Sequence, residues 1–299
     1  MGAEATMGWE FKLAMEPGAA PHVFDVSSEP YPFLSESLGM SEEHLDGNGA
    51  RGTRSAYANR VRSGNQTVGG GIVLNVTPGM LTSLLPRILG SASVGTLAET
   101  LPAFGVMIDR ASKVFTYSDC LINRATFRAS AGGLLELELD IFGLTETVAA
   151  KGSFPALTIT ETVADQPLTF MDGVYELPST LEVTGFELVI DNAVARRFAN
   201  STTATALTPG DRIVTTRLTT PWNDTNASLY ADGIAGVVGQ YTLTNDDVSL
   251  VIDLPSVQIP RQTPVYSARN GETFLTLAGA CRRTTTDAEV SMTLDATTV

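Results

Sequence analysis

The stretch Val68–Gly90, VGGGIVLNVTPGMLTSLLPRILG, contains the signals of two successive elements. Val68, Ile72, Leu74 and Val76 alternate with Gly71, Val73 and Asn75, which approximates the two-residue period of a strand with one face more buried than the other. Thr77 is suited to cap a helix, Pro78 to occupy its first position, and Gly90 to end it. The intervening apolar stripe lies on one helix face and consists of Met80, Leu81, Leu84, Leu85, Ile88 and Leu89.

This order of strand, cap and helix recurs later in the chain. Thr77-Pro78 matches Thr220-Pro221, and Gly90 matches Gly233. A strand-like run over residues 212–219 precedes the second copy. The second helix has a weaker apolar face, which consists of Trp222, Leu229, Tyr230 and Ile234.

The segments that follow the two copies also correspond. Residues 114–143 and 248–280 each predict two strands around a glycine-containing turn. Superposing the turn glycines places three residues of the first half on three of the second, namely Leu135 on Thr273, Leu137 on Leu275 and Leu139 on Leu277. This recurrence indicates a tandem duplication.

The predicted fold is mainly β with short flanking helices, in two tandem domains of the β-sandwich or half-barrel type. We assign residues 1–160 to the first domain and 161–299 to the second. A strand over residues 7–15 begins the first domain, and we expect residues 181–192 to be its counterpart in the second.

The composition restricts the class of protein. The chain has 299 residues, 43% of them hydrophobic and 17% charged, which is typical of a folded protein with a substantial core. No apolar run is long enough to span a bilayer, and no signal sequence is recognisable, so we expect no membrane association and no export. A net charge of −14 repels phosphate and argues against tight, non-specific DNA binding.

The residues that most catalytic and metal sites require are scarce. The only cysteines, Cys120 and Cys281, fall in what we interpret as corresponding late strands, where buried core residues are expected. The only histidines, His22 and His44, are expected at the surface. Phosphate-loop, nucleophile-elbow and zinc motifs are absent from the sequence. We therefore expect no catalytic site, no cofactor and no metal, and hence no enzyme.

Residues 19–67 form a long, loop-like region with a divided charge pattern. Acidic residues come first and basic residues second: Glu42, Glu43 and Asp46, then Arg51, Arg54, Arg60 and Arg62. A loop of this length in a compact domain is usually functional or ordered by a partner. Both a solvated loop and a surface for head-to-tail self-association fit the pattern.

Three carboxylates, Glu136, Glu138 and Asp140, alternate with apolar residues along one predicted strand. A glycosidase places two carboxylates across a cleft from each other. Acids at every second position of one strand instead point in the same direction. The pattern therefore favours an acidic, solvated sheet face.

The order of several segments resembles the major tail tube proteins of long-tailed, non-contractile bacteriophages. The segments are PFLSESL, the Gly-Gly-Gly-strand-Thr-Pro-helix unit, TYSDCLINRATFRASAGGLLELELDIFG, VTGFELVIDNAVARRF and YTLTNDDVSLVIDLPSVQI. The resemblance covers residues 5–295 and rests on order and spacing, since no single motif is diagnostic. It departs from the family pattern in lacking a recognisable C-terminal immunoglobulin-like domain.

The resemblance implies a structural virion protein that is made in the host cytoplasm and polymerises with itself and other tail proteins. Inner strands of all subunits would join into a barrel around a negatively charged lumen, through which DNA passes without specific binding. The duplication favours the two-domain variant of the family, which forms trimeric, pseudo-six-fold rings rather than hexamers. Residues 19–67 would match the family's loop to a neighbouring subunit or ring. Candidates for the lumen lining are Glu136, Glu138 and Asp140.

Two other classes of protein remain open from the sequence alone. A β-sandwich binding or adhesion module accounts equally well for the strands and the acidic charge, but it predicts aromatic clusters at one edge. Trp9 and Trp222 are far apart in the sequence. A hydrolase with a carboxylate pair is the third class, and it lacks an identifiable base or metal site.

Overall fold

The computed structural model describes residues 10–47, 55, 58–90, 97–157, 166–171, 173–224, 236–245, 248–264 and 272–296. The mainly β fold predicted from the sequence is confirmed. Elements of the first half are β1 (Lys12–Pro17), β2 (Glu29–Pro30), β3 (Ser35–Glu36), β4 (Gly39–Asp46), the 3-10 turn η2 (Ala58–Arg60), β5 (Val61–Asn75), α1 (Pro78–Leu89), β6 (Phe104–Asp109), β7 (Lys113–Ser130), β8 (Glu136–Gly143) and β9 (Thr145–Ala150). Those of the second half are β10 (Gly173–Glu176), β11 (Gly185–Asp191), β12 (Ala195–Arg197), β13 (Ala206–Thr208), β14 (Ile213–Pro221), β15 (Val237–Thr244), β16 (Val248–Gln258), β17 (Phe274–Cys281) and β18 (Ser291–Ala296).

Helix α1 begins and ends where the sequence predicts. The Thr77 side chain accepts a hydrogen bond from the backbone N–H of Met80, and Pro78 is the first helical residue. Gly90 follows the helix with φ of 85°, in the left-handed region that glycine adopts without strain. The apolar stripe is buried apart from the partly exposed Met80.

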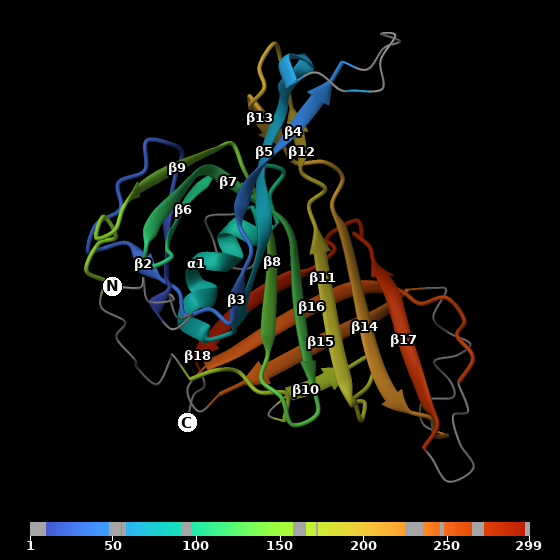
Figure 1. Cartoon of the computed structure of the whole chain (residues 1–299). Helices are drawn as coiled ribbons and strands as arrows, with labels where there is room; N and C mark the ends of the chain where they lie inside the picture. Colours follow the sequence, from blue (N-terminus) through green and yellow to red (C-terminus); the bar gives the residue numbers. More distant parts are fainter. Residues whose placement is uncertain are drawn as a thin grey trace.

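The principal sheet contains strands from both halves of the chain. Strands β5, β8 and β7 of the first half continue into β11, β14 and β17 of the second through antiparallel pairing of β7 with β11. These strands run side by side across Figure 1, in that order. Along each of these strands buried residues alternate with partly or fully exposed ones. The buried residues form the face that packs on the core, and the others form the opposite face.

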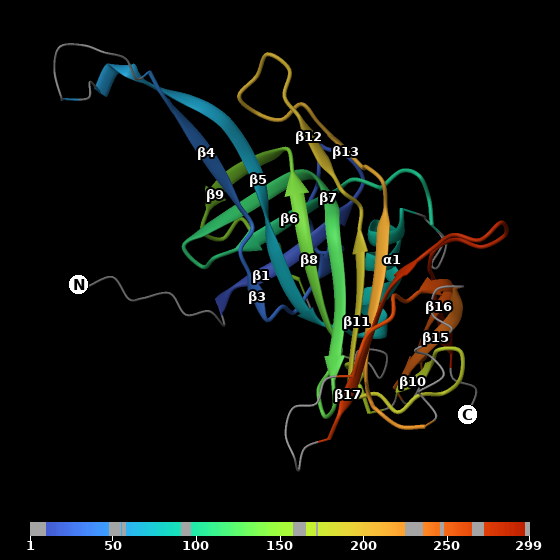
Figure 2. The same cartoon turned by 90° about the vertical axis from the view of Figure 1, so that its right-hand side faces the viewer.

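A second layer covers the core on the other side. Residues 113–120 of β7 pair with β6 and β9, whereas residues 121–130 of the same strand pair with β8 and β11. Asp119, where the strand passes from one layer to the other, has φ of 50°. Strands β1, β6 and β9 therefore lie beside the β5 end of the principal sheet, at the left of Figure 1, and β10, β15, β16 and β18 lie behind its other end. Helix α1 lies on the core side of the principal sheet (Figures 1 and 2).

The same pattern of strand pairing occurs in both halves. In the first half β1 pairs with β6, β6 with β7, β7 with β8 and β9, and β8 with β5, whose other edge pairs with β3 and β4. In the second half β10 pairs with β15, β15 with β16, β16 with β17 and β18, and β17 with β14, whose other edge pairs with β11. All of these pairings are antiparallel.

The register of pairing corresponds as well. The eight-residue ladder between β5 and β8 matches the ladder between β14 and β17, and the end pairs are Val68↔Gly143 and Asn75↔Glu136 in the first half and Val214↔Cys281 and Pro221↔Phe274 in the second. An irregularity of the same form interrupts β6–β7 and β15–β16; its flanking pairs are Phe104↔Cys120 and Val106↔Tyr117, and Val237↔Val257 and Gly239↔Leu254. Because a bulge adds residues on one strand only, its recurrence fixes the alignment of the halves.

This alignment corrects the predicted position of the second helix start. Thr220 and Pro221 belong to strand β14, and the Thr220 hydroxyl donates to the carbonyl of Glu182. The counterpart of Thr77 is Asn223, which is also a helix-capping residue type. Trp222 is not helical, and the remaining predicted helix residues and Gly233 lie outside the described residues.

Two other correspondences predicted from the sequence are wrong. The counterpart of β1 is β10 rather than a strand within 181–192, because β10 pairs with β15 as β1 does with β6. Cys120 is on β7 and Cys281 on β17, which are not corresponding strands. Both thiols are free and buried, as expected, and burial raises the pKa of Cys281 to about 12. The predicted domain boundary falls in residues 158–165, outside the described part of the chain.

Residues 19–67 contain more regular structure than a loop. Strand β4 and the first part of β5 form a hairpin that projects from the body, at the top of Figure 1. All residues of β4 but Gly39 are exposed, so neither face carries the alternation of apolar residues that identifies a strand in a sequence. The preceding segment is anchored to α1, where the buried Arg87 guanidinium donates to Glu29 at 2.8 Å and to the Tyr31 hydroxyl at 3.0 Å.

Candidate assembly surfaces

The tip of the β4–β5 hairpin brings part of the predicted self-association surface together. Glu42, Glu43 and Asp46 are exposed on β4, and Arg60 and Arg62 are exposed at the start of the returning strand. Pairing of Leu45 with Arg62 and of Asp46 with Val61 places both signs of charge at the same end. Arg51 and Arg54, at the turn, lie outside the described residues.

A second hairpin, β12–β13, supports the base of this arm. The backbone N–H of Gln66 donates to the carbonyl of Thr202 at 2.6 Å. Arg196 on β12 donates to the carbonyl of Val68 at 2.8 Å, and its guanidinium lies 3.5 Å from the centre of the Phe142 ring. The second half of the chain thus holds the arm of the first. Sequence reasoning missed this contact, because a three-residue strand gives too little periodicity to detect.

The three predicted acids share the exposed face of β8 with neighbouring cations. Glu136 and Glu138 both accept hydrogen bonds from Arg128, at 2.9 and 3.3 Å, and Asp140 accepts one from Asn123 at 2.7 Å. The prediction that these acids point the same way holds, but the neighbouring strand β7 partly neutralises them. The sequence contained a signal for this pairing, because Arg124 and Arg128 are an even number of residues apart and therefore fall on the same face of β7.

Charges alternate in sign across this face. The cross-strand row runs through β8, β7, β11 and β14, and its members are Glu136, Arg128, Glu187 and Arg217. Arg124 forms a second link between the halves, with its guanidinium 2.6 Å from Asp191. The exposed face of the six principal strands carries five carboxylates and three guanidinium groups, so its net charge is −2. Little of the −14 of the whole chain is therefore concentrated here.

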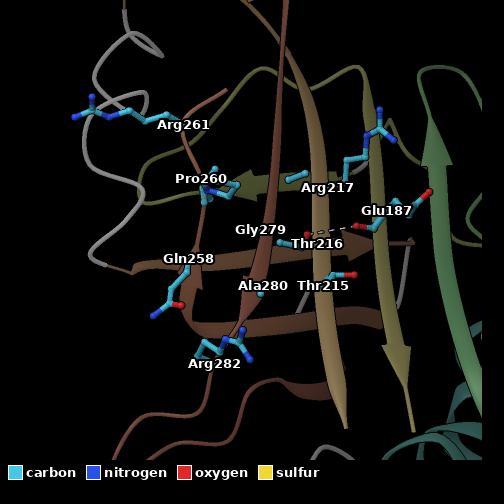
Figure 3. A pocket seen from close by; sticks show the side chains of 12 residues that line it. Glu187, Thr215, Thr216, Arg217, Gln258, Pro260, Arg261, Gly279, Ala280 and Arg282 are labelled. Carbon is cyan, nitrogen blue, oxygen red and sulfur yellow. Dashed lines mark hydrogen bonds between the residues drawn. The ribbon is translucent and has the colours of Figure 1, made fainter. Parts of the chain in front are cut away.

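One end of the principal sheet is left incompletely paired. Among the described residues, β17 pairs along its whole length with β14 but with β16 only at Val257↔Cys281 and Gln258↔Ala280. A hollow of about 760 Å³ lies at this end. Its floor on β17 consists of the small residues Ala278, Gly279 and Ala280, whose side chains leave the space open. Figure 3 shows Pro260 and Arg261 on the far side of β17 from β14.

Within the described part of the chain, side chains rather than a strand cover the opposite end of the sheet. The carbonyl of Leu38, between β3 and β4, accepts hydrogen bonds from the Tyr117 hydroxyl at 2.9 Å and from Arg110. The N–H of Met40 donates to Glu146 at 3.2 Å. Unpaired edges promote association, and polar caps of this kind reduce that tendency.

The expected surface positions of the histidines hold for one of the two. His44 is exposed on β4, whereas His22 is half-buried and accepts a hydrogen bond at Nε2 from the N–H of Asp119, 3.2 Å away. Burial lowers the pKa of His22 below its ordinary value. Within the described residues, no group of three or more His, Cys, Asp or Glu side chains is placed to hold a metal ion. No helix in this part of the chain is long and apolar enough to cross a membrane.

Comparison with known proteins identifies a family that the chain matches over nearly its whole length. The family model described as phage tail tube protein matches residues 1–296. A search of curated proteins finds no match to the chain.

Proposed function

Because the chain belongs to the phage tail tube protein family, we propose that three copies close into a ring and that these rings stack into the tube that delivers DNA. Members of this family are structural components of the virion that assemble with themselves and with other tail proteins. The observation that carries the proposal is the repeated pairing pattern, in which one chain contains two equivalent sheet units joined edge to edge at β7 and β11.

The number of copies follows from this repeat. Two equivalent units in each chain make a ring of three chains pseudo-six-fold, and a closed ring leaves no unpaired strand edge. The matching registers and bulges support an origin of the two units, at residues 1–160 and 161–299, by tandem duplication. Unrelated strand arrangements would have no reason to share a bulge at the same position.

The bare face of the principal sheet is the proposed lumen lining. When a sheet curls into a ring, one face turns inward and the other outward. Helix α1 and the second layer cover one face and form the core with it. No element of the described part of the chain covers the other face, so this face lines the channel in this proposal, and it includes Glu136, Glu138 and Asp140.

The charges on this face suit a polymer that must pass without adhering. A net charge of −2 for each chain gives weak repulsion of phosphate, and the alternating row offers no large cationic patch. Because these side chains are already paired with each other, DNA would pass them without binding and without releasing its own counterions. The charged arm at Glu42, Glu43, Asp46, Arg51, Arg54, Arg60 and Arg62 is the proposed contact with a neighbouring subunit or ring.

Electron microscopy of the purified chain at rising concentration tests the proposal. Rings or tubes with a central channel are expected. Monomers that persist at high concentration would contradict the assembly and favour a β-sandwich binding module.

The proposed lumen has a separate test. The variant Glu138→Lys adds positive charge to the bare face, and we expect its rings to retain DNA on a filter at low salt, whereas wild-type rings do not. Glu182→Lys makes the same change of charge at an exposed residue outside the principal strands and serves as the control. Equal retention by both variants would exclude this face as the lining.

A further inference from the structure

The segment that leads into the second unit packs on the end of the first unit. The N–H of Leu168 donates to the carbonyl of Val76 at 2.9 Å, and the carbonyl of Leu168 accepts a hydrogen bond from the N–H of Leu135 at 2.8 Å. Two residues further on, the N–H of Phe170 donates to the carbonyl of Gly133 at 3.1 Å. Leu168 and Phe170 are both buried in this position. Val76 and Leu135 thus form a receiving site for the chain that enters the next unit.

The second unit has the same site. Trp222 follows β14 as Val76 follows β5, and Thr273 precedes β17 as Leu135 precedes β8. The N–H of Trp222 donates to the carbonyl of Thr273 at 2.8 Å, as that of Val76 does to Leu135. No described residue bonds to the carbonyl of Trp222 or the N–H of Thr273, which are the groups that Leu168 satisfies in the first unit.

The receiving site of the second unit is exposed, whereas that of the first is covered. Trp222 is 37% exposed and its counterpart Val76 only 1%. Thr273 is partly exposed, and its counterpart Leu135 is buried. A large aromatic side chain in water beside two unsatisfied backbone groups indicates a contact that the single chain does not complete.

The first unit is preceded by a segment of the required kind. Leu13 of β1 is the counterpart of Tyr175 of β10, because they pair with equivalent residues of β6 and β15. Met7-Gly8-Trp9 ends four residues before Leu13, and Leu168-Thr169-Phe170 ends five residues before Tyr175. Each triplet has a large apolar residue first and an aromatic residue last. The difference of one residue falls in a turn, where lengths vary most.

We propose, on the premise of the ring-forming function, that residues 7–9 of one copy occupy the receiving site at Trp222 and Thr273 of a neighbouring copy. Residues 7–9 lie outside the described part of the chain. The backbone of Met7 bonds to the two open groups, and the side chains of Met7 and Trp9 cover the ring of Trp222. This contact lies on the core side of the sheet and ties each copy to the next by its own chain.

The receiving site belongs to another copy because of the order of strands in the sheet. The segment before β10 reaches the first unit across β11, the strand that borders that unit. The counterpart of β11 is the segment 35–41, which lies at the end of the sheet away from the second unit. Figure 1 shows β2, the partner of β1, at the left, whereas β14 ends and β17 begins at the lower right.

Cysteine cross-linking tests the contact. Thr169 and Leu134 form an antiparallel bridge at the internal site, and the hydrogen bonds on either side of it make this a non-bonded pair. The equivalent pair between copies is Gly8 with Glu272. A Cα separation of about 4.5 Å in such a pair suits a disulfide. Oxidised rings of Gly8→Cys/Glu272→Cys should therefore give a covalent ladder that ends at three chains on a non-reducing denaturing gel.

Three controls define the result. Mixing the two single variants should give covalent dimers only. Thr169→Cys/Leu134→Cys should form its disulfide within one chain and stay at the mass of one chain. Gly8→Cys/Asp211→Cys, with the second thiol at the opposite end of β14, should not cross-link. Equal ladders from this variant and from Gly8→Cys/Glu272→Cys would overturn the contact.

A pair of serine variants gives a second, independent test. Met7→Ser/Trp9→Ser should leave the Tm of the monomer unchanged and raise the concentration at which rings form about tenfold, because the lost burial is between copies. Leu168→Ser/Phe170→Ser makes the same kind of change at the internal site and should lower the Tm of the monomer. A monomer Tm lowered equally by both variants, or an unchanged threshold for the first, would overturn the contact.

Failure of this inference differs from failure of the proposed function. Wild-type rings visible by electron microscopy, together with no cross-link between positions 8 and 272, would overturn the contact and leave the ring-forming function intact. Failure of the wild-type chain to form rings would instead contradict the proposed function and this inference with it.

Discussion

At the scale of single residues, Arg87 links the helix predicted from the sequence to a segment for which the sequence predicts a loop. Its guanidinium is buried on α1 and bonds to Glu29 and Tyr31, and the Tyr31 hydroxyl also contacts Ser83. Sequence periodicity placed the helix correctly but gave no sign that a charged residue on it would be buried. A buried charge is retained only when its hydrogen bonds are satisfied.

Replacement of this anchor should destabilise the chain. We expect Arg87→Leu to lower the free energy of unfolding by about 1–3 kcal/mol, because Tyr31 is buried and loses a hydrogen-bond partner. Chemical denaturation measures the change. Arg62→Leu, at an exposed position on β5, should stay within about 0.5 kcal/mol of the wild type. Equal effects of the two substitutions would exclude the anchor.

His22 should make stability depend on pH. Burial is the largest cause of its lowered pKa, and Asp119 and Glu16 oppose the shift. The unfolded chain therefore binds a proton at higher pH than the folded chain, so stability is present above the ordinary pKa of 6.5 and is lost as pH falls below it. We expect the loss of Tm between about pH 7.5 and pH 5.5 to be smaller in His22→Gln. An unchanged loss would show that other groups dominate.

At the scale of elements, β5 passes close to the segment between β3 and β4. Gly70 has φ of 156°, and a Cβ there would meet the backbone of Ser37 and Leu38. Gly70→Ala should cost about 1–3 kcal/mol of stability, since the backbone must shift. Gly39→Ala, where nothing lies within 4 Å, is the control and should be close to neutral. A neutral result at Gly70 would contradict the close approach.

The side chains that bond to the backbone of Leu38 and Met40 give a second prediction at the scale of elements. Glu146→Gln/Tyr117→Phe weakens the caps on Met40 and Leu38, so we expect rings to form at a lower protein concentration than for the wild type. Light scattering against concentration measures this threshold. Glu182→Gln removes an exposed carboxylate elsewhere and should leave the threshold unchanged. A threshold that stays the same in the double variant would mean that the caps do not restrain assembly.

Elements with strong local signals were predictable, and elements that depend on distant pairing were not. The helix start at Thr77 and the alternation along β8 are encoded within a few residues. The match of Thr220-Pro221 to Thr77-Pro78 was a coincidence of two residues, whereas the superposition of Leu137 on Leu275 agrees with the strand ladders. Register depends on partners far away in the sequence, so a local motif cannot fix it.

At the scale of the whole molecule, the sequence predicted the recurrence of similar segments but not how the halves meet. The joint between β7 and β11 makes one continuous sheet from two equivalent units. The three acids on β8 were predictable from their alternation, but their pairing with Arg128 depends on the neighbouring strand. The assembly proposal rests on this geometry, in which one chain supplies two equivalent units to a single sheet.

Native mass spectrometry of the smallest ring tests this account most directly. Three chains in each ring are predicted, because each chain supplies two of six equivalent units. A ring of six chains, or a chain that stays monomeric at every concentration, would contradict it.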